Sequence, residues 1–319
     1  MLSAYASILS AVVPIFLLLL VGWSFRKRDW LKTQADDSLR VLIVNVFAPC
    51  LIFSFIAGNE AVKDPVNLGL PPILGFLSIA GGFALAYAAG KWFGLKVGTG
   101  RRTFAFTSGI YNYGFVPIPL LIALFPGDTG TLGVLMVFNV GVEIAIWSIG
   151  IVLISGKLTR DSFKQLLNPP LMAVLLALLT NTVGLDAHIP LWFDRLLEML
   201  GFCYIPLGII LAGAILADHT TQTGLLRPFR IPAAACLFRL LLLPILLILP
   251  ALIFELSEEM TKILIIQAAM PAGIFPLVLT RHFGGDTKVA VQVILTTTLV
   301  SLITIPLWIV IGLGLAGLA

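Results

Sequence analysis

A stretch at residues 107–120 holds Asn112, Gly114, Pro117 and Pro119, a group whose types and spacing predict a binding site. The stretch lies inside an apolar run long enough to cross a bilayer. The two prolines predict a break in that spanning helix, because proline supplies no N–H and its ring clashes with the preceding turn. A second half-helix that begins near Pro117 would direct free N–H groups and its positive dipole end toward the membrane midplane. Such a helix end attracts anions.

A similar pattern recurs in residues 269–277, with Pro271, Ala272, Gly273 and Pro276 at the centre of another apolar run. A shift of 157 residues places three prolines on prolines: Pro49 on Pro206, Pro71 on Pro228, and Pro119 on Pro276. Corresponding breaks in two halves are typical of secondary transporters that bind substrates at the midplane. Proline kinks without function are the alternative, and the second break disfavours it.

The composition excludes an ordinary soluble domain. Of the 319 residues 59% are hydrophobic and only 11% are charged, and the mean hydropathy is +1.06; soluble proteins carry about 25% charged residues. The three cysteines lie in apolar runs without metal-ligand spacing. The formal charge of +4 comes from basic residues in short loops, so it does not indicate nucleic-acid binding. The sequence predicts an integral membrane protein whose partners are the lipid bilayer and a small solute.

Apolar runs of about 20 residues predict membrane spans. Ten such runs occur, at residues 5–25, 41–57, 71–91, 103–125, 133–155, 169–185, 194–216, 231–254, 262–282 and 287–316. The loops after the odd-numbered spans carry most of the 20 Lys and Arg residues, whereas the opposite loops carry only Lys63, Arg195 and Lys262. By the positive-inside rule, we expect a multi-pass protein of the cell membrane with both termini outside the cytoplasm.

Ten spans divide into two sets of five. We therefore predict an all-α fold with a first repeat at residues 1–156, a cytoplasmic linker at 157–168 and a second repeat at 169–319. A repeat with an odd number of spans forces its second copy to be inverted, and the predicted breaks then fall in helices 4 and 9, which correspond in the two repeats.

Polar residues deep in the spans predict a site for a coupling ion or proton. Asn139 and Glu143 are four residues apart and share a helix face, and Gln267 and Thr296 lie in the ninth and tenth spans. The alternatives are structural, since threonine bonds its own helix and amides join neighbouring helices. A carboxyl at the depth of Glu143 is protonated, titrating or paired, with Arg239 as one candidate partner; Arg239 alternatively extends toward the inner face.

The chemistry expected at the breaks favours a small organic anion, most simply a carboxylate. Two half-helix N-termini favour negative charge, and neutral donors lie close by: Tyr111, Asn112 and Tyr113. No ring of acidic residues is available to hold an organic cation. No cofactor is predicted other than a coupling Na⁺ or H⁺.

The ten spans, the Asn112-Tyr-Gly-Phe-Val-Pro-Ile-Pro119 segment, the Pro271…Pro276 segment and Asn45…Pro49 resemble the auxin efflux carrier family. The resemblance covers the whole chain. Bacterial members carry malonate, malate and related carboxylates, and plant members export indole-3-acetate. The long cytoplasmic loop of the plant carriers is absent here, which favours a bacterial type of substrate.

The resemblance implies the fold of bile-acid/sodium symporters. Spans 1, 2, 6 and 7 would form a scaffold, through which homodimers are usual, and the other spans would form a transport domain that moves as an elevator. Substrate would lie between the crossing of helices 4 and 9 and two scaffold residues, Asn45 and Tyr204. Coupling to sodium, to protons or to neither is known within this wider fold.

Other functions remain open from sequence. Two alternatives remain within transport: an auxin-like aromatic carboxylate exporter, and a sodium- or proton-coupled exchanger of another ion. Proton antiporters of related architecture usually have two acids near the crossing, and this sequence has no such pair beside its breaks. An intramembrane aspartyl protease needs two membrane aspartates, and every Asp here lies in a loop or at a span end. We therefore expect no enzymatic activity. A structural or receptor role needs no mid-membrane breaks.

Overall fold

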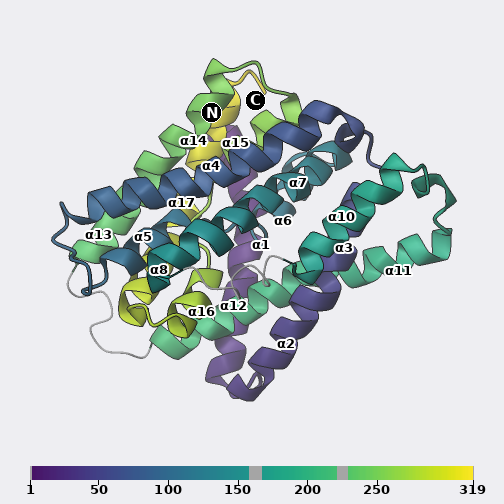
Figure 1. Ribbon diagram of the computed structural model, residues 1–319. Helices are drawn as coiled ribbons and strands as arrows, with labels where there is room; N and C mark the ends of the chain where they lie inside the picture. Colours follow the sequence, from purple (N-terminus) through teal and green to yellow (C-terminus); the bar gives the residue numbers. More distant parts are fainter. Residues whose placement is uncertain (1, 158–166, 221–228, 319) are drawn as a thin grey trace.

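The computed structural model describes residues 2–157, 167–220 and 229–318 (Figure 1). In this part of the chain the regular structure is helical, apart from one isolated bridge. Both termini lie at the same end of the molecule, and α1 (Leu2–Lys27) runs from that end to the opposite one. The predicted linker at 157–168 lies almost wholly outside the described residues, as do Arg160, Lys164 and Arg227 of the predicted cytoplasmic loops.

After α1, the first half of the chain forms a short 3₁₀ turn and then a bent helix made of three consecutive pieces. Its elements are η1 (Thr33–Ala35), α2 (Asp36–Leu42), η2 (Ile43–Phe47), α3 (Ala48–Ile56), η3 (Glu60–Lys63), α4 (Pro65–Gly90), α5 (Arg101–Gly109), α6 (Pro117–Leu124), α7 (Thr129–Ala145), η4 (Ile146–Gly150) and α8 (Ile151–Ser155). Both η2 and η4 are π-helical turns inside longer helices, a feature that is frequent at functional sites.

The second half also contains both continuous and interrupted helices. Its elements are α10 (Pro169–Thr182), η5 (Asp186–His188), α11 (Leu191–Phe202), α12 (Tyr204–Thr220), α13 (Arg230–Leu237), the π-helical η6 (Phe238–Leu242), α14 (Leu243–Ile253), α15 (Glu258–Ala269), α16 (Phe275–His282) and α17 (Thr287–Leu315).

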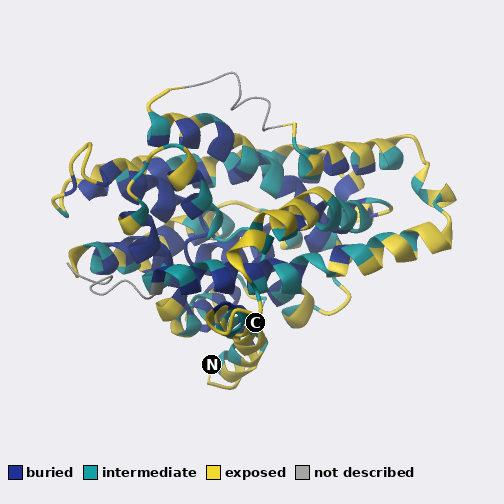
Figure 2. Cartoon of the chain, turned by 90° about the horizontal axis from the view of Figure 1, so that it is seen from below, coloured by how far each residue is buried: buried dark blue, intermediate teal, exposed yellow. Residues whose placement is uncertain are grey.

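Seven helical segments of the described chain are long and apolar enough to cross a membrane: Leu2–Lys27, Thr33–Ile56, Pro65–Gly90, Thr129–Ser155, Leu191–His219, Arg230–Ile253 and Thr287–Leu315. The apolar helix Pro169–Thr182 is shorter. Many large apolar side chains are exposed, including Leu179, Trp192 and Met199 on α10 and α11. Figure 2 shows buried residues gathered on the inner helices and exposed ones at the periphery. This distribution fits a polytopic protein whose rim faces lipid.

Two helices are interrupted where prolines predict a break. The first break, residues 110–116, separates α5 from α6, and the second, residues 270–274, separates α15 from α16. Pro117 is the first residue of α6, and Pro276 lies in the first turn of α16, where the missing N–H costs no helical bond. The expected position of the second half-helix at Pro117 is confirmed.

The two breaks pair with each other through their backbones, and together we call them the crossover. The Asn112 N–H donates to the Pro271 carbonyl at 2.9 Å, and the Gly273 N–H donates to the Ile110 carbonyl at 2.9 Å. These bonds form an antiparallel bridge between Tyr111 and Ala272. Non-helical backbone at membrane depth must find partners inside the protein. The pairing supplies them and fixes the two breaks against each other.

Glycines bring two pairs of helices into very close contact. A Cβ on Gly141 of α7 would lie 1.8 Å from the Pro72 carbonyl oxygen of α4, and one on Gly22 of α1 would lie 1.9 Å from the Ile210 carbonyl oxygen of α12. Small residues at such contacts allow backbones to approach where no hydrophobic force drives association. Of these helices, α4 packs against α5, which leads into the first break, and α1 contacts α6, which follows it.

Candidate functional site

A cavity of about 710 Å³ extends to the crossover. Segments from both halves form its walls: α2, η2, α3, the first break, α7, α10, α12 and α16. The lining includes much of the residue set predicted from sequence, namely Tyr111, Asn112, Tyr113, Gly114, Asn139, Glu143, Tyr204, Gly273 and Pro276. Residues that are more than 160 positions apart in the sequence, such as Tyr111 and Pro276, therefore line the same cavity.

Besides Asn45, six predicted residues do not line this cavity. Pro271 and Ala272 are buried in the second break, and Pro117 and Pro119 lie in the first turn of α6. Gln267 is buried in α15 behind the first break, and Thr296 lies on α17 with no hydrogen-bond partner for its hydroxyl in the described chain.

Asn45 is placed outside the cavity, contrary to the expectation that it faces the substrate. It is exposed on η2, whereas Ile43, Val44 and Ala48 of the same bent helix line the cavity. A π-helical turn has more residues per turn than an α-helix and changes which face a residue occupies. The Asn45 side chain therefore points elsewhere than an unbroken α-helix would aim it.

Glu143 is the carboxyl that lines the deep part of the cavity. One of its oxygens accepts from the Tyr113 hydroxyl at 2.5 Å, and the other accepts from the Trp147 ring N–H at 2.8 Å. Trp147 also lines the cavity. Sequence reasoning missed Trp147, although it continues the i, i+4 face of Asn139 and Glu143. The proposed pairing of Glu143 with Arg239 is not found, because both carboxyl oxygens have other partners.

The Tyr113 carbonyl brings two predicted polar residues together. The side-chain amides of Asn139 and Gln267 both donate to this oxygen, each at 3.2 Å. Their own side-chain oxygens are buried without a hydrogen-bond partner in the described part of the chain. Since the carbonyl fixes which end of each amide faces it, the two unpartnered oxygens are directed away from it. Both amides hold the first break in position.

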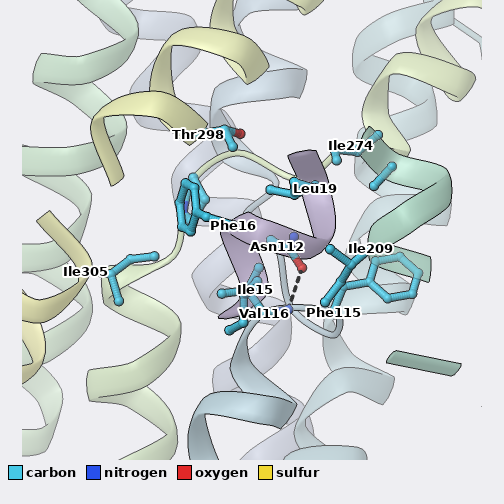
Figure 3. A pocket seen from close by; sticks show the side chains of 12 residues that line it. Ile15, Phe16, Leu19, Asn112, Phe115, Val116, Ile209, Ile274, Thr298 and Ile305 are labelled. Carbon is cyan, nitrogen blue, oxygen red and sulfur yellow. Dashed lines mark hydrogen bonds between the residues drawn. The ribbon is translucent and has the colours of Figure 1, made fainter. Parts of the chain in front are cut away.

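Asn112 lies between the large cavity and a second, much smaller one. The small pocket, with space of about 20 Å³, is lined mainly by apolar side chains of α1, α12 and α17 together with Asn112 and Thr298. In Figure 3 the Asn112 side chain lies at the centre of these residues, and its oxygen accepts from the Val116 N–H at 3.3 Å. Asn112 thus belongs to the wall that separates two sides of the crossover.

Tyr204 closes the cavity against the first break from the α12 side. Its ring stacks on Phe115 with centroids 4.8 Å apart. A Cβ on Gly114 would lie 3.0 Å from the Tyr204 hydroxyl oxygen. A glycine at position 114 lets the tyrosine approach the backbone of the break, so that a hydroxyl from α12 reaches the crossover.

Arg239 of η6 is fully buried behind the crossover. Its guanidinium donates to backbone carbonyls at the end of α15: Nε to Met270 at 2.9 Å, and Nη2 to Ala268 at 3.2 Å and to Gln267 at 3.4 Å. The alternative in which Arg239 extends toward the inner face does not apply, because the side chain has no exposed surface.

Within residues 2–157, 167–220 and 229–318, no three His, Cys, Asp or Glu residues are grouped as metal ligands. The polar groups at the crossover are amide, hydroxyl and indole groups, with one carboxyl.

Comparison with known proteins agrees with this architecture. A family described as "Membrane transport protein" matches residues 7–309. A protein of Methanothermobacter thermautotrophicus named "Uncharacterized transporter" is 24% identical over 316 residues, which cover 94% of this chain and 97% of that protein.

Proposed function

The chain belongs to the membrane transport protein family, and we propose that it is a secondary active transporter of a small organic anion. The observation that carries the proposal is the cavity of about 710 Å³ that ends at two paired, proline-bordered helix breaks. Broken helices at the middle of a membrane domain are where transporters of several folds bind their substrates. A carboxylate such as malonate or malate is the simplest substrate of this class.

The chemistry of the crossover supports a negatively charged substrate. The N-termini of α6 and α16 begin there, and their dipoles favour negative charge. The Tyr204 hydroxyl and the Asn112 amide supply neutral donors at the cavity wall. Glu143 disfavours an anion only while it is ionised, and its two donors, Tyr113 and Trp147, are groups that a substrate carboxylate can also use.

Alternating access would use ten spans arranged as two inverted repeats. In this arrangement the paired breaks belong to helices 4 and 9, and α1, the α2–α3 helix, α10 and the α11–α12 segment form the scaffold. The large cavity includes Asp37, Asn168 and His282, which lie at three loops predicted to be cytoplasmic. The small pocket on the other side is sealed by apolar residues of α1, α12 and α17. These features support an inward-open state of an elevator in a cell-membrane protein with both termini outside.

Coupling to H⁺ or Na⁺ would involve the polar group around the first break. Glu143 lines the cavity and is suited to proton uptake. The unpartnered oxygens of Asn139 and Gln267 are acceptors of the type that sodium prefers. Thr296 lies on α17, whose next residue, Thr297, accepts from the Ala272 N–H of the second break, and its buried hydroxyl is a further candidate in this proposal. A homodimer through the scaffold helices would leave both cavities free.

An aromatic carboxylate is the second candidate substrate. The cavity walls carry Tyr113, Phe115, Trp147, Tyr204 and Phe275, and a volume of about 710 Å³ is in the range of pockets that hold drug-sized ligands. An exchanger of another ion is the alternative if no carboxylate is carried.

Uptake into proteoliposomes tests the proposal. The panel is malonate, malate, succinate, acetate and indole-3-acetate, each with and without sodium and pH gradients. We expect uptake of at least one acid, reduced about tenfold or more by Asn112→Ala because that amide lies at the wall of the cavity. Asn45→Ala is the matched control, since the same amide is removed from the exposed face of η2. No uptake of any acid by folded protein would contradict the proposal, and equal losses in the two variants would contradict the placement of the site.

A further inference from the structure

Arg239 carries a charge that no acidic group balances within the described residues. The ion pairs found there join other residues, and Glu143 is bonded to Tyr113 and Trp147. All three hydrogen bonds of the guanidinium go to neutral backbone carbonyls, and Nη1 has no hydrogen-bond partner. A buried charge without a counter-ion is expensive inside a membrane and is usually tied to function.

The position of this charge connects it to both breaks. Met270, which accepts from Nε, directly precedes Pro271, whose carbonyl accepts from the Asn112 N–H. On its other side, the guanidinium lies over the ring of Tyr111, with 5.1 Å from its central carbon to the ring centroid. Tyr111 lines the large cavity and its hydroxyl contacts Ser78 at 2.7 Å. One side chain therefore lies against backbone of the second break and a cavity-lining ring of the first.

A role limited to capping α15 does not account for all of these features. The carbonyls at a helix C-terminus attract cations, and an arginine there stabilises the helix. A cap, however, needs neither complete burial nor a guanidinium nitrogen left without a partner. The partial charge of a helix end is about half an elementary charge, so a positive potential remains at the crossover.

We propose that Arg239 provides the fixed positive charge that makes the crossover select anions. The inference rests on the proposed function as an anion transporter and names a residue that determines its specificity. Arg239 does not line the cavity and acts on the substrate through the field across Tyr111 and the backbone of the second break. Because charges in a low-dielectric interior interact over several ångströms, direct contact is not needed.

Matched acids and amides separate the charge from the cap. The probes are malonate with malonamide, and indole-3-acetate with indole-3-acetamide, and their binding to the purified protein is measured by calorimetry. Arg239→Gln keeps a donor for the carbonyls and removes the charge, whereas Arg239→Lys keeps the charge. We expect Arg239→Gln to lower the acid-to-amide affinity ratio about tenfold or more, and Arg239→Lys to keep the ratio within about threefold. An unchanged ratio in Arg239→Gln, with both ligands weakened equally, would show a cap only and overturn the proposal.

A second measurement does not depend on the substrate. Trp147 lines the cavity, so its fluorescence, taken as the difference between each protein and its Trp147→Phe counterpart, reports which solutes enter. We expect the ratio of quenching by iodide to quenching by neutral acrylamide to be lower in Arg239→Gln than in wild type and Arg239→Lys. An equal ratio in all three would overturn the fixed-charge role. Absence of acid binding by the wild type, together with a charge-dependent iodide ratio, would reject the carboxylate substrate and retain the role of Arg239.

Discussion

The two breaks share a backbone design and differ in their side chains. Both are bordered by a proline at the start of the following half-helix, and each donates one N–H to the other. The first break presents Tyr111, Asn112 and Tyr113 to the cavity. The second consists of Met270 to Ile274 and offers no polar side chain. Side-chain recognition is therefore concentrated on one of two geometrically related segments.

The side chains that hydrogen-bond the carbonyls of the two breaks also differ, in their charge. Neutral amides of Asn139 and Gln267 hold the Tyr113 carbonyl of the first break. A cation, Arg239, holds the Met270 carbonyl at the second. The paired backbones are therefore supported differently: by neutral amides at the first break and by the guanidinium of η6 at the second.

The largest effect is expected at the carboxyl attached to the first break. Glu143→Gln preserves size and one acceptor oxygen for Trp147, and its NH₂ can donate to the Tyr113 hydroxyl, but the side chain cannot gain or lose a proton. If the first break carries proton coupling, pH-driven uptake should fall about tenfold or more and its dependence on external pH should disappear, as measured in proteoliposomes at a series of pH values. Trp147→Phe is the control, because it removes a donor and keeps the carboxyl. An unaltered pH dependence in Glu143→Gln would move coupling away from the first break.

Prediction from sequence succeeded where a residue acts on its own backbone. Pro117 and Pro276 mark the half-helix starts because proline has no N–H to donate, which is a local property. Asn139 and Glu143 were predicted to share a face from their spacing, and both line the cavity. Polar residues in an apolar span have few alternatives, so their inward direction is predictable.

Prediction failed where the outcome depends on a distant segment or an irregular turn. Asn45 was misplaced because the π-helical η2 alters the helix face, and no simple residue pattern announces such a turn. Arg239 was considered as a partner of Glu143 because charge alone favours it, yet its partners are carbonyls that only become available where α15 ends. Tyr204 was expected at the site only through the family resemblance, and it does line the cavity; the approach of α12 to the first break that places it there is a long-range contact that no local pattern encodes.

A smaller effect, on protein stability, should distinguish the two breaks when a glycine in each is replaced by alanine. A Cβ on Gly273 would lie 3.1 Å from the Tyr111 carbonyl oxygen, and one on Gly114 would lie 3.0 Å from the Tyr204 hydroxyl oxygen. The Tyr111 backbone is fixed by the pairing of the two breaks, so it can move away from an added Cβ less easily than the Tyr204 side chain can. Gly273→Ala should therefore destabilise the protein by about 1–3 kcal/mol and lower the apparent Tm in detergent. Gly114→Ala should change Tm less and reduce uptake by displacing Tyr204. The opposite order of Tm values would show that the first break is the more rigid.

The smallest effect is expected at an ion pair that joins the N-terminus of α7 to α15, the helix that leads into the second break. Asp128 caps the N-terminus of α7, and one of its oxygens accepts from Lys262 of α15 at 2.8 Å. Burial raises the pKa of Asp128, but bonds from Lys262 and Thr131 and the Lys262 charge outweigh it and hold that pKa below its ordinary value. Asp128→Asn keeps a capping oxygen and removes the charge, so it should cost about 1 kcal/mol or less at pH 7.

The pH dependence of this cost follows from linkage. Because the folded-state pKa of Asp128 is lowered, its contribution is complete above the unfolded value of about 4 and is lost as the pH falls through the folded value. Thermal unfolding of wild type and Asp128→Asn should therefore differ at pH 7 and converge below about pH 4. Lys63, which forms ion pairs with the exposed Glu60 and the half-buried Asp186, lies outside the cavity lining. Lys63→Met is therefore a control variant that should leave uptake unchanged. Since Asp128 and Lys262 link α7 to α15 without touching the cavity, Asp128→Asn should alter stability and spare substrate affinity. A change in affinity would mean that the two breaks are coupled through their supporting helices as well as through the crossover.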